Sequence, residues 1–307
     1  MKRRNKAVHY AIILVVIVCA VILSFTFKGV PTVTKSDAIL EEIRKNLNEF
    51  EEEPDDAYID RVWKKTPGRN GLRVLVNESY QNMKKNGKFD PSLFVYEEVP
   101  PSVRLEDLPA APIYRGHPEK MMVAFLINVS WGEEHLPTIL KTLKEHDVKA
   151  TFFIEGKWAK EHKQYVEMIV EQGHLIGNHA YNHPDMAHLS EGEIRKQISD
   201  TNDILEAMTD HRPKWFAPPS GSYNDRVVKI AFEENMETIL WSVDTIDWKN
   251  PSVSVMINRV MKNIHPGAMI LMHPTEPVAQ GLSSLIEQIE EKNYKIDTVE
   301  NLLSEAR

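Results

Sequence analysis

The sequence contains a single cysteine, Cys19, among its 307 residues. One cysteine excludes an internal disulfide, and it also excludes a zinc site built from clustered thiolates. Positive charge is scarce too, because 37 Lys and Arg are outnumbered by 45 Asp and Glu, for a net charge of −8. An acidic chain matches a phosphate backbone poorly, so we expect no nucleic-acid partner. The chain also lacks a glycine-rich turn of the dinucleotide-binding type, which argues against a nucleotide-binding sheet.

The positive charge that is present is concentrated at the amino terminus. Residues 1–36 carry six basic residues and no acidic residue, and within them 10–27 is an uncharged apolar run of 18 residues. That length is the lower limit for a helix that spans a bilayer. Because basic residues precede the run, we expect a cytoplasmic tail at 1–9, an anchor at 10–27 and an extracytoplasmic body. Cleavage of 10–27 as a signal is the alternative, and it would give a secreted protein.

Residues 28–118 predict a helical and mixed accessory region with a linker. A possible N-cap and apolar residues at helical spacing predict a helix over 36–53, which Pro54 and its acidic neighbours are expected to end. A short apolar run at 72–76 and proline-rich sequence over 100–118 follow. No residue pattern in this region indicates chemistry.

From residue 119 to 307, apolar runs of strand length alternate with helical periodicities. Such alternation predicts a parallel α/β domain, and six or seven units of it favour barrel-like closure. The fold class that we expect is therefore α/β. The strand-length runs are 122–127, 150–154, 175–177, 215–217, 238–243 and 268–272.

Histidines and carboxylates occur directly after these runs, where the loops of a parallel barrel build an active site. His179 and His183 are four residues apart and suit one divalent metal such as zinc; two loop histidines with local hydrogen bonds are the alternative. His273 suits a general acid, or else a satisfied histidine at a strand end. Asp247 and Trp248 suit an orienting carboxylate beside an apolar or sugar-stacking wall, or else an N-cap and a core tryptophan.

These segments together resemble the polysaccharide deacetylase family, also called the NodB-homology or carbohydrate esterase 4 family. The resemblance covers 121–305 and implies a distorted (β/α) barrel that removes N-acetyl groups from peptidoglycan- or chitin-type sugars. With the anchor and the accessory region, it looks most like a sporulation-associated branch of that family. The segments that carry the resemblance are 127–132, 149–153, 177–183, 216–221, 241–248 and 271–273.

The resemblance also implies a role for each matching residue. His179 and His183 correspond to metal ligands, and His273 corresponds to the acid that protonates the leaving amine. Asp247 corresponds to the aspartate that orients the catalytic partners. The residues expected to bind substrate are Trp248, Leu271, Pro218, Pro219 and Tyr181.

Two positions depart from the family pattern at the chemistry itself. Asn128 stands at the base position, where a neutral amide cannot accept a proton at pH 7. Val129 stands at the third metal-ligand position and cannot bind a metal, and no carboxylate occurs between Glu119 and Glu133. Loss of a general base costs on the order of 10²–10⁴ in rate. We therefore expect impaired activity and a divalent metal bound weakly or not at all.

Further departures leave alternatives open. Ala217 replaces an arginine that would accompany Asp247, and Ala180 replaces a Ser or Thr that would support the histidines. Rescue by Glu133 or Glu134, or by His273 acting as the base, is conceivable. The leading hypothesis is an impaired deacetylase of cell-wall or spore-wall glycan. The alternatives are a non-catalytic, anchored glycan-binding or assembly protein on the same barrel, and a metal-free barrel enzyme on a small molecule.

Overall fold

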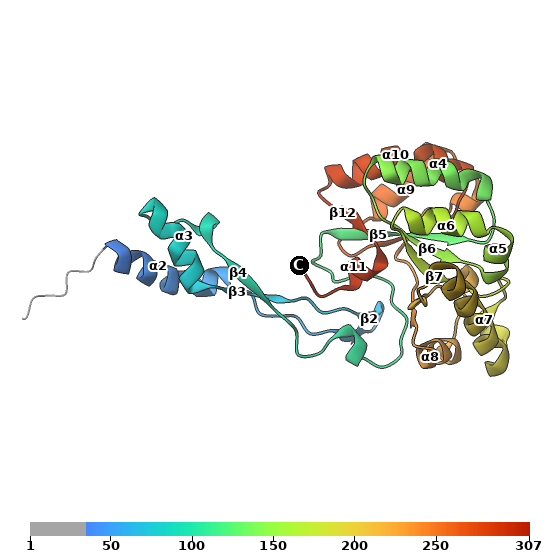
Figure 1. The fold of residues 1–307 in the computed structure, drawn as a ribbon, viewed down its shortest axis with the longest axis horizontal. Coiled ribbons are helices and arrows are strands. Elements are labelled where there is room, and N and C mark those ends of the chain that lie inside the picture. The colour runs from blue at the N-terminus through green and yellow to red at the C-terminus, as the bar shows by residue number, and fades with distance from the viewer. Residues whose placement is uncertain (1–34) are drawn as a thin grey trace, which may run out of the picture. The chain divides into compact units, whose positions relative to one another are not determined.

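The computed structural model describes residues 35–307, which divide into two compact units (Figure 1). The first unit comprises residues 35–51 and Arg73–Glu97, and the second comprises Glu52–Leu72 and Glu98–Arg307. The predicted tail at 1–9 and anchor at 10–27 lie outside the described residues. Within 35–307, no helix has both the length and the apolar character needed to cross a membrane.

The first unit is built on two helices, α2 (Lys35–Phe50) and α3 (Val76–Asn86), with a 3-10 turn, η1 (Pro91–Leu93). Ile43 of α2 and Met83 of α3 are fully buried in one apolar cluster. The helix predicted over 36–53 is thus confirmed, although it ends at Phe50, before the acidic segment. The apolar run at 72–76 forms part of β3 (Gly71–Val74), which pairs with β4 (Tyr96–Val99).

The second unit contains a curled sheet of eight strands, in the order β10-β11-β5-β6-β7-β8-β9, with β12 paired to β5. All pairs in this sheet are parallel. The strands are β5 (Met122–Val129), β6 (Thr151–Ile154), β7 (Leu175–Asn178), β8 (Trp215–Phe216), β9 (Glu237–Thr238), β10 (Val243–Asp244), β11 (Met269–Met272) and β12 (Lys295–Asp297). A hairpin of β1 (Tyr58–Asp60) and β2 (Lys64–Thr66) belongs to the same unit.

The sheet is an incomplete barrel. Its end strands, β9 and β10, do not pair with each other within the described residues. The single run predicted at 238–243 is therefore two strands, because the chain crosses the open side between them. Backbone hydrogen bonds of this segment show the crossing. The amide of Ile239 donates to the carbonyl of Phe216 in β8, whereas the amide of Ser242 donates to the carbonyl of Met269 in β11. The predicted parallel α/β domain is confirmed, and the closure is partial.

Helices cover the outer face of the sheet (Figure 1). Along β5, Phe125, Ile127 and Val129 lie in the core between sheet and helices, whereas Ala124 and Leu126 lie in a second core on the inner face. This alternation is the ordinary period of a strand. The helices are α4 (Leu136–Glu145), α5 (Gly156–Glu161), α6 (Lys163–Glu171), α7 (Glu191–Thr209), α8 (Asp225–Glu233), α9 (Val253–Asn263), α10 (Glu276–Glu291) and α11 (Val299–Leu303).

Short 3-10 turns occupy several loops of the second unit. Four of them lie in loops that follow strands of the sheet: η3 after β5, η4 after β7, η5 after β8 and η6 after β10. Because parallel strands end at one edge, these loops meet there and position the candidate site. The turns are η2 (Leu105–Asp107), η3 (Glu133–His135), η4 (Met186–His188), η5 (Pro219–Gly221) and η6 (Asp247–Lys249).

Candidate active site

The loops after β10 and β11 form a pair of a buried aspartate and a partly exposed histidine. His273 Nδ1 lies 3.1 Å from Asp247 Oδ1, and the His273 amide donates to Asp247 Oδ2 at 3.1 Å. Because the carboxylate can only accept, the ring proton lies on Nδ1. The pairing therefore leaves Nε2 of His273 available to hold or release a proton.

Hydroxyl groups complete the surroundings of Asp247. Thr245 donates to Oδ1 at 2.6 Å and Thr275 donates to Oδ2 at 2.9 Å. Burial raises the pKa of Asp247, but hydrogen bonds from His273, Thr245 and Thr275 outweigh it, and the net pKa lies below its usual value. The carboxylate thus stays ionised and holds His273 in one orientation.

His179 and His183 lie together in the loop after β7. Their ring centroids are 5.2 Å apart at an interplanar angle of 69°. His179 is buried, and its Nδ1 donates to the carbonyl of Ala217 at 2.7 Å, so its Nε2 carries the lone pair. Burial, together with the charges of His183 and His273, lowers the pKa of His179 to about 3. The three predicted histidines therefore lie close enough together for the charges of two of them to lower the pKa of the third.

Strained backbone accompanies these loops. Ala180 (φ 60°), His183 (φ 55°) and Ile246 (φ 50°) all adopt the left-handed conformation without being glycine. Such conformations cost of order 1–3 kcal/mol each and persist where the surrounding structure fixes them. At Ile246 the amide donates to Asp244 Oδ1 at 2.8 Å, which holds the turn that presents Asp247.

Asn128 lies one residue before the end of β5, and its side-chain oxygen has no hydrogen-bond partner. The residue is 5 % exposed, and its Oδ1 accepts no hydrogen bond. Strand alternation places its side chain on the inner face with Leu126. Ser130 Oγ is also buried without a hydrogen bond, although it lies near enough to Glu155 to lower the pKa of that carboxyl. Burial dominates there and raises the pKa of Glu155 overall.

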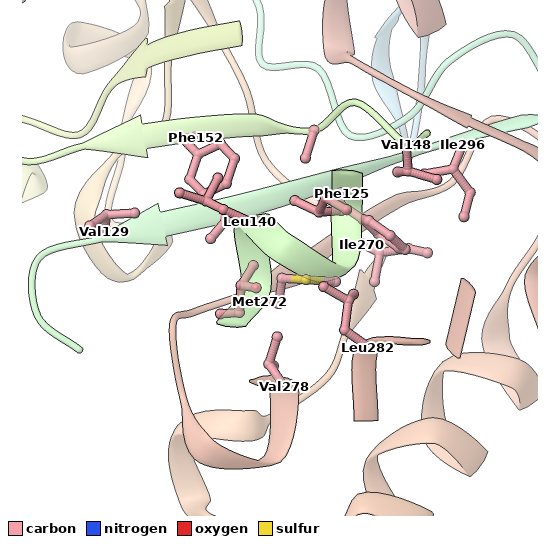
Figure 2. Close-up of a cluster of buried hydrophobic side chains, with 14 of the residues drawn as sticks. Phe125, Val129, Leu140, Val148, Phe152, Ile270, Met272, Val278, Leu282 and Ile296 are labelled. Carbon is pink, nitrogen blue, oxygen red and sulfur yellow. The ribbon is translucent and has the colours of Figure 1, made fainter. Parts of the chain in front are cut away.

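Val129 matches the metal-ligand position in sequence, but its side chain lies elsewhere. It is fully buried in the core between sheet and helices, together with Met272 and Val278 (Figure 2). That core lies on the opposite face of β5 from Asn128. The side chain at position 129 therefore fills the core instead of facing the paired histidines.

The donor set for a divalent metal is incomplete. His179 and His183 supply two imidazoles, and Asn128 supplies at most an unpartnered amide oxygen. Residues 35–307 contain no group of three His, Cys, Asp or Glu side chains placed to hold an ion. A zinc site normally takes at least three protein ligands. The residues present do not fit a tightly held metal, and no catalytic step is derived through one.

The carboxylates considered as replacements are paired with residues that are not part of the predicted site. Glu133 accepts from Trp158 Nε1 at 3.4 Å, and Glu134 lies 3.6 Å from His135. Both therefore have partners outside the candidate site.

The predicted substrate-binding residues differ in exposure. Trp248 is 53 % exposed, whereas Leu271 is buried in β11. Pro218 and Pro219 are buried where η5 begins. Tyr181 is partly buried, with its ring 5.4 Å from Lys160 Nζ of α5.

Sequence reasoning missed several residues of this site. Thr245 and Thr275 each lie two residues from a predicted site residue, and a hydroxyl beside a buried carboxylate was the available signal. Trp131 stacks on His273, with 6.0 Å between ring centroids and 9° between planes. The only signal for Trp131 was its position two residues after the end of β5.

Comparisons with known proteins agree with this geometry. Residues 115–239 match the family model described as polysaccharide deacetylase. The chain is 51 % identical over 281 residues to "Uncharacterized protein YlxY" of Bacillus subtilis strain 168, covering 91 % of this chain and 88 % of that protein. A peptidoglycan-N-acetylglucosamine deacetylase of Bacillus cereus is 36 % identical over 199 residues, which are 63 % of this chain and 72 % of that protein.

Among solved structures, the chain is similar to BA3943 of Bacillus anthracis, described as a CE4 family pseudoenzyme. The TM-score is 0.84 at 52 % identity, covering 88 % of this chain and 96 % of that one. A mutant of BA3943, described as having restored enzymatic activity, also matches at a TM-score of 0.84, with 51 % identity over 88 % of this chain and 99 % of that one.

Proposed function

The chain belongs to the polysaccharide deacetylase family, and from that premise we propose that it is an envelope protein of deacetylase type with impaired activity. The observation that carries the proposal is the contrast between a complete Asp247–His273 pair and an incomplete donor set around His179 and His183. The proposed substrate is a peptidoglycan- or chitin-type sugar that carries N-acetyl groups. Named relatives that are peptidoglycan deacetylases support this substrate class.

The proposed location and domain organisation rest on the sequence. The apolar run at 10–27 would anchor the chain with its body outside the cytoplasm, or release it if cleaved. We propose 28–118 as an accessory region and 119–307 as the deacetylase-like domain.

In the proposed reaction, His273 acts late. Its Nδ1–H is held by Asp247, so Nε2 is the atom that would give a proton to the departing amine nitrogen. Asp247 remains ionised and stabilises the charged imidazole. Trp248 and Leu271 would form the walls beside the acetyl group.

The first step of the proposed reaction, attack of water on the acetamide, lacks a base. Attack on an acetamide needs a base to take a proton from water, and Asn128 is a neutral amide that cannot do so. The proposed chain therefore retains a proton donor without a matching acceptor at the base position.

A second candidate function is a non-catalytic glycan-binding or assembly protein. Val129 favours it, because its side chain fills the core and the strand end is built for packing. The similarity to BA3943, described as a pseudoenzyme, also favours it.

Acetate release distinguishes the two functions. An N-acetylglucosamine pentamer is incubated with the full chain in detergent and zinc, beside the His273→Ala variant. Impaired activity predicts slow release that His273→Ala abolishes, whereas equal release by both proteins removes the catalytic proposal. Asn128→Asp is the gain-of-function arm, and we expect it to raise release about 10²-fold or more.

Equilibrium dialysis against zinc tests the donor set directly. With two imidazoles and no carboxylate, we expect less than one zinc per chain at micromolar zinc. His179→Ala is the matched control and should abolish what binds. Stoichiometric, tight binding by the unaltered chain would contradict the incomplete site.

A further inference from the structure

Trp131 lies in the loop after β5 and is held flat against His273. The centroids of the two rings are 6.0 Å apart and their planes differ by 9°. Parallel rings at that separation are offset from each other, so much of the indole surface is not covered by the imidazole. Trp131 is 46 % exposed, whereas a tryptophan that only packed His273 would gain from deeper burial.

A close backbone approach fixes this placement. Gly132 has a φ of +82°, and a Cβ atom there would lie 2.0 Å from the carbonyl oxygen of Pro274. Only glycine therefore lets the loop after β5 press against the loop after β11. A side chain that is held in place before binding loses little conformational entropy when a ligand arrives.

A second exposed tryptophan directly follows the aspartate of that pair in the chain. Trp248 is 53 % exposed and directly follows Asp247, which is hydrogen-bonded to His273. Trp131 therefore contacts the histidine of the pair, and Trp248 follows its aspartate. Exposed aromatic side chains gathered around a concentration of polar groups mark a binding surface.

We infer that Trp131 is a sugar-binding residue, whose uncovered face stacks against the apolar C–H face of a pyranose ring beside His273. The inference rests on the proposed function and names the residue that would select its substrate. Sugars whose substituents are all equatorial, such as N-acetylglucosamine, present flat C–H faces to an indole. Trp248 keeps its proposed place beside the acetyl group of the same sugar.

Calorimetric titration of the full chain in detergent with an N-acetylglucosamine pentamer tests this assignment. Trp131→Ala is expected to weaken binding about tenfold, and Trp131→Phe to retain part of it, because aromatic anchors dominate binding energy. Phe232→Ala is the matched control. Phe232 is 41 % exposed and lines a separate cavity of about 680 Å³ with Trp215 and Glu237, so binding should not change.

Proton spectra of the sugar report the stacking itself. Ring-current shifts of its C–H protons should appear with the unaltered chain and disappear with Trp131→Ala, at an unchanged thermal midpoint of unfolding. Affinity that survives Trp131→Ala within twofold overturns this inference and leaves the proposed function standing. Absence of binding by the unaltered chain overturns both. A mannose pentamer, which has an axial hydroxyl, should bind more weakly, and equal binding overturns the proposed match to a flat sugar face.

Discussion

The loop after β10 holds a buried carboxylate that accepts four hydrogen bonds, whereas the end of β5 and its loop hold a buried amide oxygen and a hydroxyl that have none. We call the first region, formed by Thr245, Asp247, His273 and Thr275, the acid half. The second, residues 128–132, is the β5 end. The two regions are therefore stabilised by different interactions: a polar network in the first and apolar packing in the second.

Because of this contrast, the presence of Asp247 and His273 is weak evidence for catalysis. A buried carboxylate with all its partners is costly to disturb, because each abandoned donor loses its hydrogen bond. Asp247 and His273 therefore stabilise the fold even where no reaction occurs. Their presence alone does not indicate activity, and the comparison must be tested by changing each half separately.

The largest expected effect comes from placing a carboxylate at position 129. Val129→Asp should lower the free energy of unfolding by about 4 kcal/mol, because an unpaired charge would enter the core beside Met272 and Val278. Urea denaturation measures the change. Asn128→Asp, one residue away on the inner face, is the control and should cost about 1–2 kcal/mol. A stable Val129→Asp protein that binds zinc tightly would show that the side chain at position 129 can leave the core and reach the histidines. That result would contradict the contrast between the two regions.

Next in size is the loss of charge in the acid half. Asp247→Asn keeps the shape but places an NH2 donor where existing donors need an acceptor, and should destabilise the protein by about 3 kcal/mol in urea. Asp244→Asn, at the end of β10, is the control: its Oδ1 accepts from the Ile246 amide, and the change should cost at most about 1 kcal/mol. Equal costs for the two variants would mean that the network adds nothing beyond single hydrogen bonds.

A smaller effect is expected on the pH dependence of stability, and it comes from a histidine outside the candidate site. His174 lies at the amino end of β7, and its Nδ1 accepts the Ala150 amide at 3.2 Å. Burial, and next the charge of Lys149, lowers its pKa from 6.5 to about 4. Between these values the unfolded chain takes up a proton that the folded chain does not, so stability falls as pH decreases. The expected loss is about 2 kcal/mol from pH 6.5 to 5.

Urea denaturation at a series of pH values checks this, with His174→Phe as the comparison. The variant loses the titrating group, so its stability should change about 2 kcal/mol less over that interval. Identical slopes for the two proteins would assign the pH dependence to other groups, including those of the site.

The sequence predicted the sheet well and the site unevenly, for physical reasons. Strand runs such as 150–154 are largely apolar because both faces are buried, and they were recognisable for that reason. The run at 238–243 was equally apolar, but it crosses the open side of the sheet as two strands. An apolar run indicates that a segment is buried, but it does not indicate where the segment changes from one partner strand to another.

Side-chain direction was the information that the sequence did not contain. Asn128 and Val129 were both expected at family positions of the site, yet the structure places them on opposite faces of β5. The partners of Asp247 were missed because threonine is a common residue, and because Thr275 reaches Asp247 from 28 positions away in the chain. The three histidines were predictable, because their residue type is rare and their places after strands are regular.

The smallest expected effects compare the same chemical change in both halves. Ser130→Ala removes a buried hydroxyl that makes no hydrogen bond of ordinary geometry and only lowers the pKa of the nearby Glu155 carboxyl, so it should change the free energy of unfolding by less than about 0.5 kcal/mol. Thr275→Val removes a hydroxyl that donates to Asp247 at 2.9 Å and caps α10, and should cost about 1–2 kcal/mol. Parallel urea titrations give both values. A cost for Ser130→Ala that equals the cost for Thr275→Val would mean that the β5 end has a polar network of its own, which would remove the distinction between the halves.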